Sequence, residues 1–155
     1  MSIYGIGFDF QNRSVWQDFL DLNIVATDWT ACDHPEFHKL FWELKPGDIV
    51  YLKKAYPAID IIEIYAVGIV RDDAVFLPHC SSQPPLNLGV EIARNVFWLK
   101  RSVDDKTPFK SPRKPQGEHN NRFLTIYKEW DASVCEGIFK VINGGSLPTL
   151  AIKKI

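Results

Sequence analysis

The sequence has few of the features that mark secreted, membrane-spanning or disulfide-bonded proteins. No apolar run approaches the roughly 20 residues that a membrane span needs. The chain does not open with a basic stretch followed by an apolar one, so we expect no secretory signal. Its three cysteines, Cys32, Cys80 and Cys135, are odd in number and far apart. That pattern is typical of reduced thiols in a cytoplasmic protein, and we expect this location.

Motifs for catalysis and metal binding are also scarce. The sequence contains no GxSxG nucleophile elbow and no CxxC pair. His34 and His38 are four residues apart, a spacing that can share a metal ion, but the string is HPEFH and not HExxH. We therefore expect no metal site and no cofactor, and we name no catalytic residue.

The chain does carry a high aromatic content and an uneven distribution of charge. Its 155 residues fit one domain, and 13% of them are aromatic. The net charge is −1, yet residues 1–93 hold 6 Lys or Arg against 13 Asp or Glu, whereas residues 94–122 hold 8 against 3. A basic stretch on an acidic protein either contacts a polyanion or is a solvated loop. In the first case the phosphate-binding residues are Lys100, Arg101, Lys110, Arg113 and Lys114.

Hydrophobic periodicity predicts three helices and several short strands. Helices are expected over 14–22, 33–44 and 131–143, capped by Ser14, Asp33 and Asp131 in turn. Strands are expected over 3–10, 23–29, 48–56, 61–73, 90–101 and 122–130, with a long exposed loop over 102–121. Because hairpins and helices mix in this order, we expect an α+β fold. Its sheet would be mixed, mostly antiparallel and curved, and would close into a partial β-barrel flanked by three helices.

The first expected strand has an unusual face. Gly5, Gly7 and Asp9 alternate along it and so lie on the same side. A dinucleotide-binding loop would need another glycine at position 10, which is Phe10. Glycine in a strand otherwise marks a bulge or a close approach. The approaching group is either another protein segment at a seam or a flat ligand.

Two tryptophans stand beside polar or basic segments. Trp29 leads into the loop TACD, and Trp98 is followed by Leu99-Lys100-Arg101. Aromatic side chains interleaved with basic ones suit stacking on bases and binding of phosphates. The alternative is that either tryptophan belongs to the core of the domain.

The segments KPGDIVYLKKAY and IIEIYAVGIVRDD resemble the PUA-like superfamily, and most closely its EVE and YTH-like branch. The strands IYGIGF and VFWLK and the closing RFLTIY unit are similar to this group as well. The resemblance implies a partly closed barrel with helices at its ends, which binds nucleic acid, often through a modified base flipped into an aromatic-lined pocket. The ligand-binding residues expected for such a pocket are Phe8, Asp9, Trp29, Lys53, Tyr56 and Trp98.

The sequence departs from that group at two places near the expected pocket. EVE proteins usually have a Ser-Glu-Pro-like stretch where this chain has Phe8-Asp9-Phe10, and Tyr-His-Ser where it has Lys53-Lys54-Ala55-Tyr56. The resemblance therefore implies the architecture more directly than the ligand. Three functions stay open: a non-enzymatic reader of DNA or RNA, a binding module for a small molecule or protein, and an enzyme that processes RNA or DNA. A reader domain alone often acts beside a separate effector protein; no membrane partner is expected, and the oligomeric state stays open.

Overall fold

The structure is a computed structural model that describes residues 1–11, 13–56, 61–78, 89–101, 108–110 and 124–143. Within these ranges the chain forms three helices and nine strands. They follow in the order β1 (Ile3–Ile6), β2 (Asp9–Phe10), β3 (Arg13–Ser14), α1 (Trp16–Leu22), β4 (Ile24–Thr27), α2 (Pro35–Glu43), β5 (Ile49–Tyr56), β6 (Ile61–Phe76), β7 (Ile92–Arg101), β8 (Pro108–Lys110), β9 (Ile126–Glu129) and α3 (Ala132–Ile142). None of the helices in the described ranges is long and apolar enough to cross a membrane.

Seven strands form one mixed sheet. Six of them follow the path β4-β7-β6-β5-β1-β9, β8 pairs with β6, and β2 and β3 form a separate two-stranded ribbon. The pair β1–β5 is parallel and every other pairing in the sheet is antiparallel. The expected α+β class and the mostly antiparallel mixed sheet are therefore confirmed.

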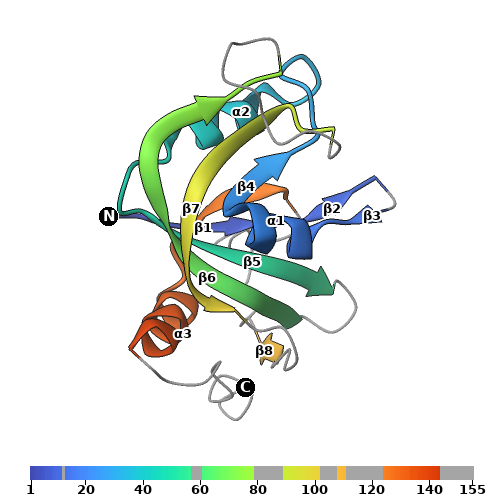
Figure 1. The fold of residues 1–155 in the computed structure, drawn as a ribbon. Helices are drawn as coiled ribbons and strands as arrows, with labels where there is room; N and C mark the ends of the chain where they lie inside the picture. The colour runs from blue at the N-terminus through green and yellow to red at the C-terminus, as the bar shows by residue number, and fades with distance from the viewer. Residues whose placement is uncertain (12, 57–60, 79–88, 102–107, 111–123, 144–155) are drawn as a thin grey trace.

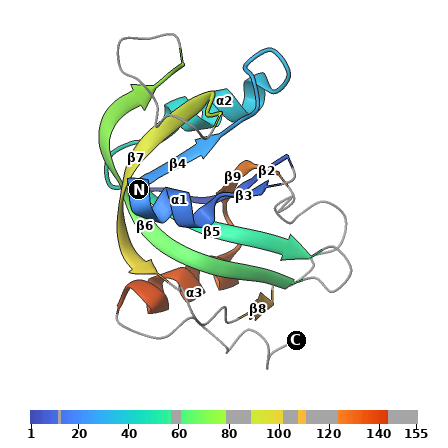
Figure 2. The same cartoon turned by 45° about the vertical axis from the view of Figure 1, so that its right-hand side comes forward.

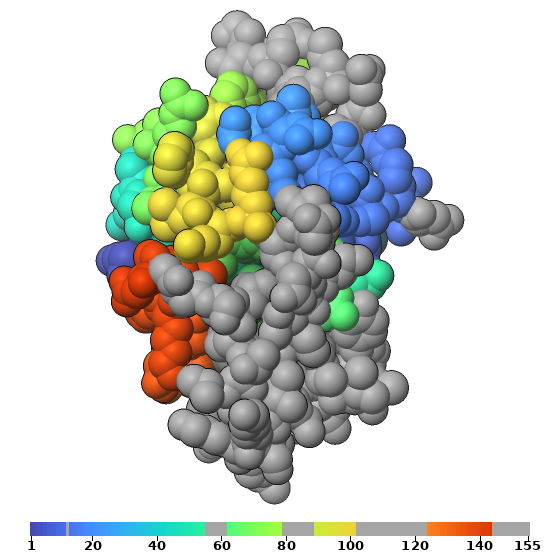
Figure 3. All heavy atoms as spheres, turned by 60° about the horizontal axis from the view of Figure 1, so that its bottom comes forward, coloured from blue at the N-terminus to red at the C-terminus, as the bar shows by residue number. Residues whose placement is uncertain are grey.

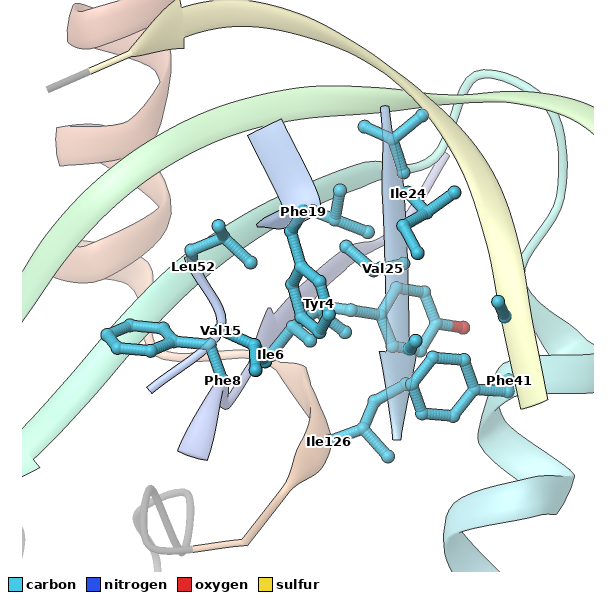
Figure 4. Close-up of a cluster of buried hydrophobic side chains, with 14 of the residues drawn as sticks. Tyr4, Ile6, Phe8, Val15, Phe19, Ile24, Val25, Phe41, Leu52 and Ile126 are labelled. Atoms are coloured by element: carbon cyan, nitrogen blue, oxygen red, sulfur yellow. The ribbon is translucent and has the colours of Figure 1, made fainter. Parts of the chain in front are cut away.

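The sheet is strongly curved, and its two faces carry separate cores. Figures 1 and 2 show α1 on the inner side of the arch formed by β6 and β7, and α3 on the outer side. The inner core joins β1, β4, β5 and β7 to α1 and α2, through side chains such as Ile6, Phe19 and Phe41 (Figure 4). The outer core joins the other face of β1, β5, β6 and β9 to α3. In the space-filling view of Figure 3, atoms of β7 lie directly beside those of α3.

The expected closure into a barrel is not found. The pairing path ends at β4 on one side and at β9 on the other, and these two edge strands do not pair with each other in the described part of the chain. A side-chain hydrogen bond between described residues spans the two edges, from Trp29 Nε1, two residues after β4, to Thr125 Oγ1, one residue before β9, at 3.0 Å. The sheet is thus open, and this hydrogen bond connects the segments next to its two edge strands at one end.

The helix starts show where local sequence signals were decisive and where they were not. Asp131 caps α3 as expected, because its carboxylate accepts hydrogen bonds from the Ser133 backbone and hydroxyl at 3.0 and 2.8 Å. The other two predicted caps are wrong. Ser14 belongs to β3, and α1 starts after Val15; α2 starts after His34 and not after Asp33. Neither of these two helices has a side-chain cap.

One residue of the basic stretch is structural. Arg94 is 1% exposed and donates to the carbonyl oxygens of Phe41, Ala74 and Asp72 at 2.6, 2.9 and 3.0 Å. Burial lowers its pKa, and the nearby Asp73 and Asp72 oppose that shift. Because Phe41 lies in the last turn of α2, Arg94 satisfies a carbonyl that the helix itself leaves open. One of the eight positive charges of residues 94–122 is therefore buried and unable to contact a ligand.

Candidate ligand-binding cleft

A polar cleft of about 180 Å³ lies where β1 ends. It lies between the end of β1, the middle of β5 and the segment that enters β9. The side walls come from segments far apart in the sequence. The lining residues are Gly7, Phe8, Asp9, Lys53, Lys54, Leu124 and Thr125. Asp9 and Leu124 are exposed, so the cleft opens to solvent on their side.

The strand expected over 3–10 ends at Ile6, so Gly5 lies in β1 and Gly7 directly after it, and the two glycines have different neighbours. A Cβ atom on Gly5 would lie 2.4–2.8 Å from the ring of Tyr127, which covers this glycine from β9. A Cβ atom on Gly7 would meet nothing closer than 3.5 Å; its nearest neighbours are the Thr125 backbone and Lys53 Nζ at 3.7 Å. Gly5 therefore lies where β1 and β9 pack tightly against each other, a contact that we call the seam, whereas Gly7 lies at the wall of the cleft.

Residues 124 and 125 form the far wall of the cleft and are held from three directions. The Thr125 carbonyl accepts from Gly7 N at 2.7 Å, and the Leu124 carbonyl accepts from Lys53 Nζ at 2.9 Å. The Thr125 hydroxyl accepts from Trp29 Nε1. Segments that follow β1 and β4 and the strand β5 thus converge on this dipeptide. No local sequence signal identifies it, because each bond depends on tertiary structure.

Lys53 places a positive charge in the cleft. Its residue is 6% exposed, and the ammonium lies 5.4 Å from the centroid of the Tyr127 ring, which suits a cation–π contact. Lys54, on the next position of β5, is half-buried and lines the cleft as well. Asp9 lines the cleft as well, so residues of both charges meet at this site.

A buried polar network supports the cleft from behind. Tyr51 donates to Glu129 at 2.7 Å, so the 2.8 Å bond between the Tyr51 and Tyr127 hydroxyls has Tyr127 as its donor. Burial raises the pKa of Tyr51 well above its ordinary value, and Tyr127 and Glu129 raise it further. The other oxygen of Glu129 accepts from the Asp131 backbone at 3.2 Å. The ring that fills the space over Gly5 is thus fixed to the start of α3.

Trp29 lies beside the cleft and does not line it. Its side chain is 43% exposed, and its indole is fixed by the bond to Thr125. The His34 ring packs against it at 4.4 Å and stacks on Phe37 at 4.6 Å. His38 Nε2 donates to the Trp29 carbonyl at 2.7 Å. Both the backbone and the ring of Trp29 are therefore held in place while much of the indole faces solvent.

The structure brings together some of the ligand-binding residues expected from the sequence. Asp9 and Lys53 line the cleft, and Trp29 lies at its rim. Phe8 contributes its backbone, but its ring is 2% exposed and packs 4.7 Å from Tyr65 at the edge of the inner core (Figure 4). Trp98 is not at the cleft, because it is 7% exposed and donates to the Phe19 carbonyl in the inner core. The side chain of Tyr56 lies outside the described part.

The expected phosphate-binding residues are only partly described. Lys100 and Arg101 end β7, and Arg101 donates to the Asn23 side chain at 3.3 Å. Arg101 of β7 pairs with Ala66 of β6, and Ala66 pairs with Leu52 of β5, the residue before Lys53. Arg101 therefore lies two strands away from Leu52. At about 4.8 Å per strand this separation is roughly 10 Å. The side chain of Lys110 and the whole of Arg113 and Lys114 lie outside the described residues.

The histidines of the second helix have separate structural partners. His34 Nδ1 pairs with Glu36 at 2.8 Å, whereas His38 bonds the Trp29 carbonyl. The bond to His34 is the main reason that the pKa of Glu36 is lowered. Among the residues that the structure describes, no three His, Cys, Asp or Glu side chains gather as a metal site would require.

Searches of protein-family models and of curated proteins return no match to this sequence.

Proposed function

We propose that this protein is a non-enzymatic nucleic-acid reader of the PUA-like kind, whose cleft takes a single base. The observation that carries the proposal is the cleft at Gly7, where a wall without a side chain lies beside Lys53, Lys54 and Asp9. An engineered cavity of about 150 Å³ in another protein holds benzene. The cleft of about 180 Å³ in this protein therefore suits one flat ring. A base that enters it must leave its stack, which favours single-stranded or flipped nucleotides, with modified bases among them.

The polar groups of the cleft match what a base edge presents. Every base carries both donors and acceptors, and the residues that line the cleft include Lys53, Lys54 and Asp9. The amines also attract phosphate, which supplies affinity for any sequence. The curved, mostly antiparallel sheet with flanking helices fits the PUA-like architecture, and the thiols Cys32 and Cys135 fit a cytoplasmic location.

The decisive experiment places a methyl group in the cleft. Gly7→Ala adds a Cβ at ordinary contact distances, so the fold should tolerate it while the space for a ring shrinks. We expect single-stranded RNA or DNA, screened with plain and modified bases, to bind the natural protein and to bind the variant at least about tenfold more weakly. Melting temperature serves as the control for folding. Unchanged binding by Gly7→Ala would mean that the base does not occupy this cleft.

A small-molecule binding module is the second candidate, because the cleft holds only one ring and residues 1–93 carry 13 Asp or Glu against 6 Lys or Arg. Salt separates the two candidates. Affinity that depends on phosphate falls steeply as salt rises, whereas a ring bound without phosphate responds little. A flat salt dependence for every oligonucleotide, or no binding at all, would favour the small-molecule module.

A further inference from the structure

We propose that the ligand extends beyond the cleft: one base occupies the cleft and the next base of the same strand stacks on the exposed indole of Trp29. The inference rests on the proposed function and names its substrate more closely. The bound species would be a single strand of at least two nucleotides, and a free base or nucleoside would make only part of the contacts.

The first support is the position of Trp29 relative to the cleft. The indole is not one of the groups that line the cleft, so it cannot form the stacking wall for a ring inside it. Its Nε1 nevertheless lies 3.0 Å from the hydroxyl of Thr125, which does line the cleft. The two sites are therefore immediate neighbours, as successive bases of one strand require when they stack on separate platforms.

The second support is that Trp29 is both exposed and rigid. Its indole is fastened at Nε1, its carbonyl is bonded by the buried His38, and His34 packs on the ring. A side chain that is already ordered loses little conformational entropy when a ligand binds, which favours its use as a stacking platform. Trp42 on α2 is 56% exposed and has no comparable bond to the cleft among the hydrogen bonds of the described residues.

The charges give the strand a direction across the site. Glu36 pairs with His34, whose ring packs on Trp29, so a carboxylate near Trp29 disfavours a phosphate there, whereas Lys53 and Lys54 lie on the β5 side of the cleft. The phosphate that follows the base in the cleft is therefore expected at Lys54, and the Trp29 side is expected to hold a base alone.

A double-mutant cycle tests the proposal on the full chain. The probes are homopolymeric single strands of RNA and of DNA, about eight nucleotides long, and the matching nucleoside 5′-monophosphates. The variants are Trp29→Ala, Gly7→Ala and the double variant, with Trp42→Ala as the matched control. Trp29→Phe serves as a second variant that keeps a stacking ring, and melting temperatures report folding.

We expect Trp29→Ala to weaken binding of the best octamer about 10- to 100-fold, the range for losing one stacked base. Monophosphate binding should stay within about twofold, and Trp42→Ala should change neither ligand. If the two sites hold different bases, the double variant should bind the octamer more weakly than either single variant. The two fold-losses need not multiply fully, because Gly7 and Trp29 both bond Thr125.

Two results would overturn the inference while the proposed function stands. If the double variant binds the octamer as tightly as the more weakly binding single variant, both residues contact the same base. If Trp29→Ala binds the octamer as the natural protein does, Trp29 is not part of the site. If the natural protein binds no octamer, or if Gly7→Ala binds octamers normally, the proposed function itself fails. All four of these outcomes are measured by octamer binding, so they can be decided even when the monophosphates bind too weakly to measure.

Discussion

Gly5 lies in β1 and Gly7 directly after the end of that strand, yet their surroundings are opposite. The Tyr127 ring covers Gly5 and is fastened through Tyr51 and Glu129 to the start of α3. Gly7 borders a cleft that opens to solvent. The contrast shows that a missing side chain in a strand has no fixed meaning. What stands on the neighbouring strand decides whether the space holds protein or can hold a ligand.

The largest expected effect is the difference in stability between the variants Gly5→Ala and Gly7→Ala. Gly5→Ala would force the Cβ against the Tyr127 ring, and β1 cannot retreat because β5 and β9 hold it on both sides. Overpacking of this kind should lower the free energy of unfolding by about 2–3 kcal/mol. Gly7→Ala should leave it unchanged or raise it by up to about 1 kcal/mol. Urea unfolding of both variants measures the difference, and equal stabilities would contradict the seam at Gly5.

The seam also predicts a dependence of stability on alkaline pH. The pKa of Tyr51 is raised in the folded protein, so above the ordinary value of 10.0 the unfolded chain releases this proton while the folded protein keeps it. Stability therefore falls as pH rises, with a contribution from Tyr51 of up to about 1.4 kcal/mol per pH unit. Tyr51→Phe should cost about 1–2 kcal/mol near neutral pH, because Glu129 loses a buried donor, and should remove this part of the decline.

The measurement is a comparison of unfolding free energies for the natural protein and Tyr51→Phe between about pH 9 and pH 11. Other groups titrate in the same range, including Tyr4, whose pKa burial also raises. They are common to both proteins, so the difference between the curves isolates Tyr51. Parallel curves across this range would show that Tyr51 ionises as readily in the folded protein as in the unfolded chain.

What the sequence could predict follows from the range of the interactions involved. The α3 cap at Asp131 was predictable, because it is formed within a few neighbouring residues. The same holds for the tight turn over 45–48, where Gly47 has a φ of 91° and the Lys45 carbonyl accepts from the Asp48 backbone at 2.9 Å. Asp9 and Lys53 were named for the site on strand alternation and on the resemblance. Leu124 and Thr125 carried no signal, since their bonds to Lys53 and Trp29 span 71 and 96 residues. Trp98 was assigned to the site although its ring belongs to the core, because adjacency to Lys100 and Arg101 says nothing about the face on which a strand residue lies.

The smallest expected effect is on the salt dependence of binding, and it is tested by comparing a lysine at the cleft with a lysine on α3. Lys54 lines the cleft, whereas Lys140 lies on α3, on the outer side of the sheet, and pairs with Glu136 at 3.2 Å. If Lys54 contacts a phosphate of a bound single strand, Lys54→Ala should reduce the slope of log affinity against log salt by about 0.7. Lys140→Ala should leave that slope unchanged, because the proposed strand does not reach α3. Since both variants remove one positive charge, an equal reduction in the two would attribute the salt dependence to net charge. A reduction confined to Lys54→Ala would instead locate the phosphate at the cleft.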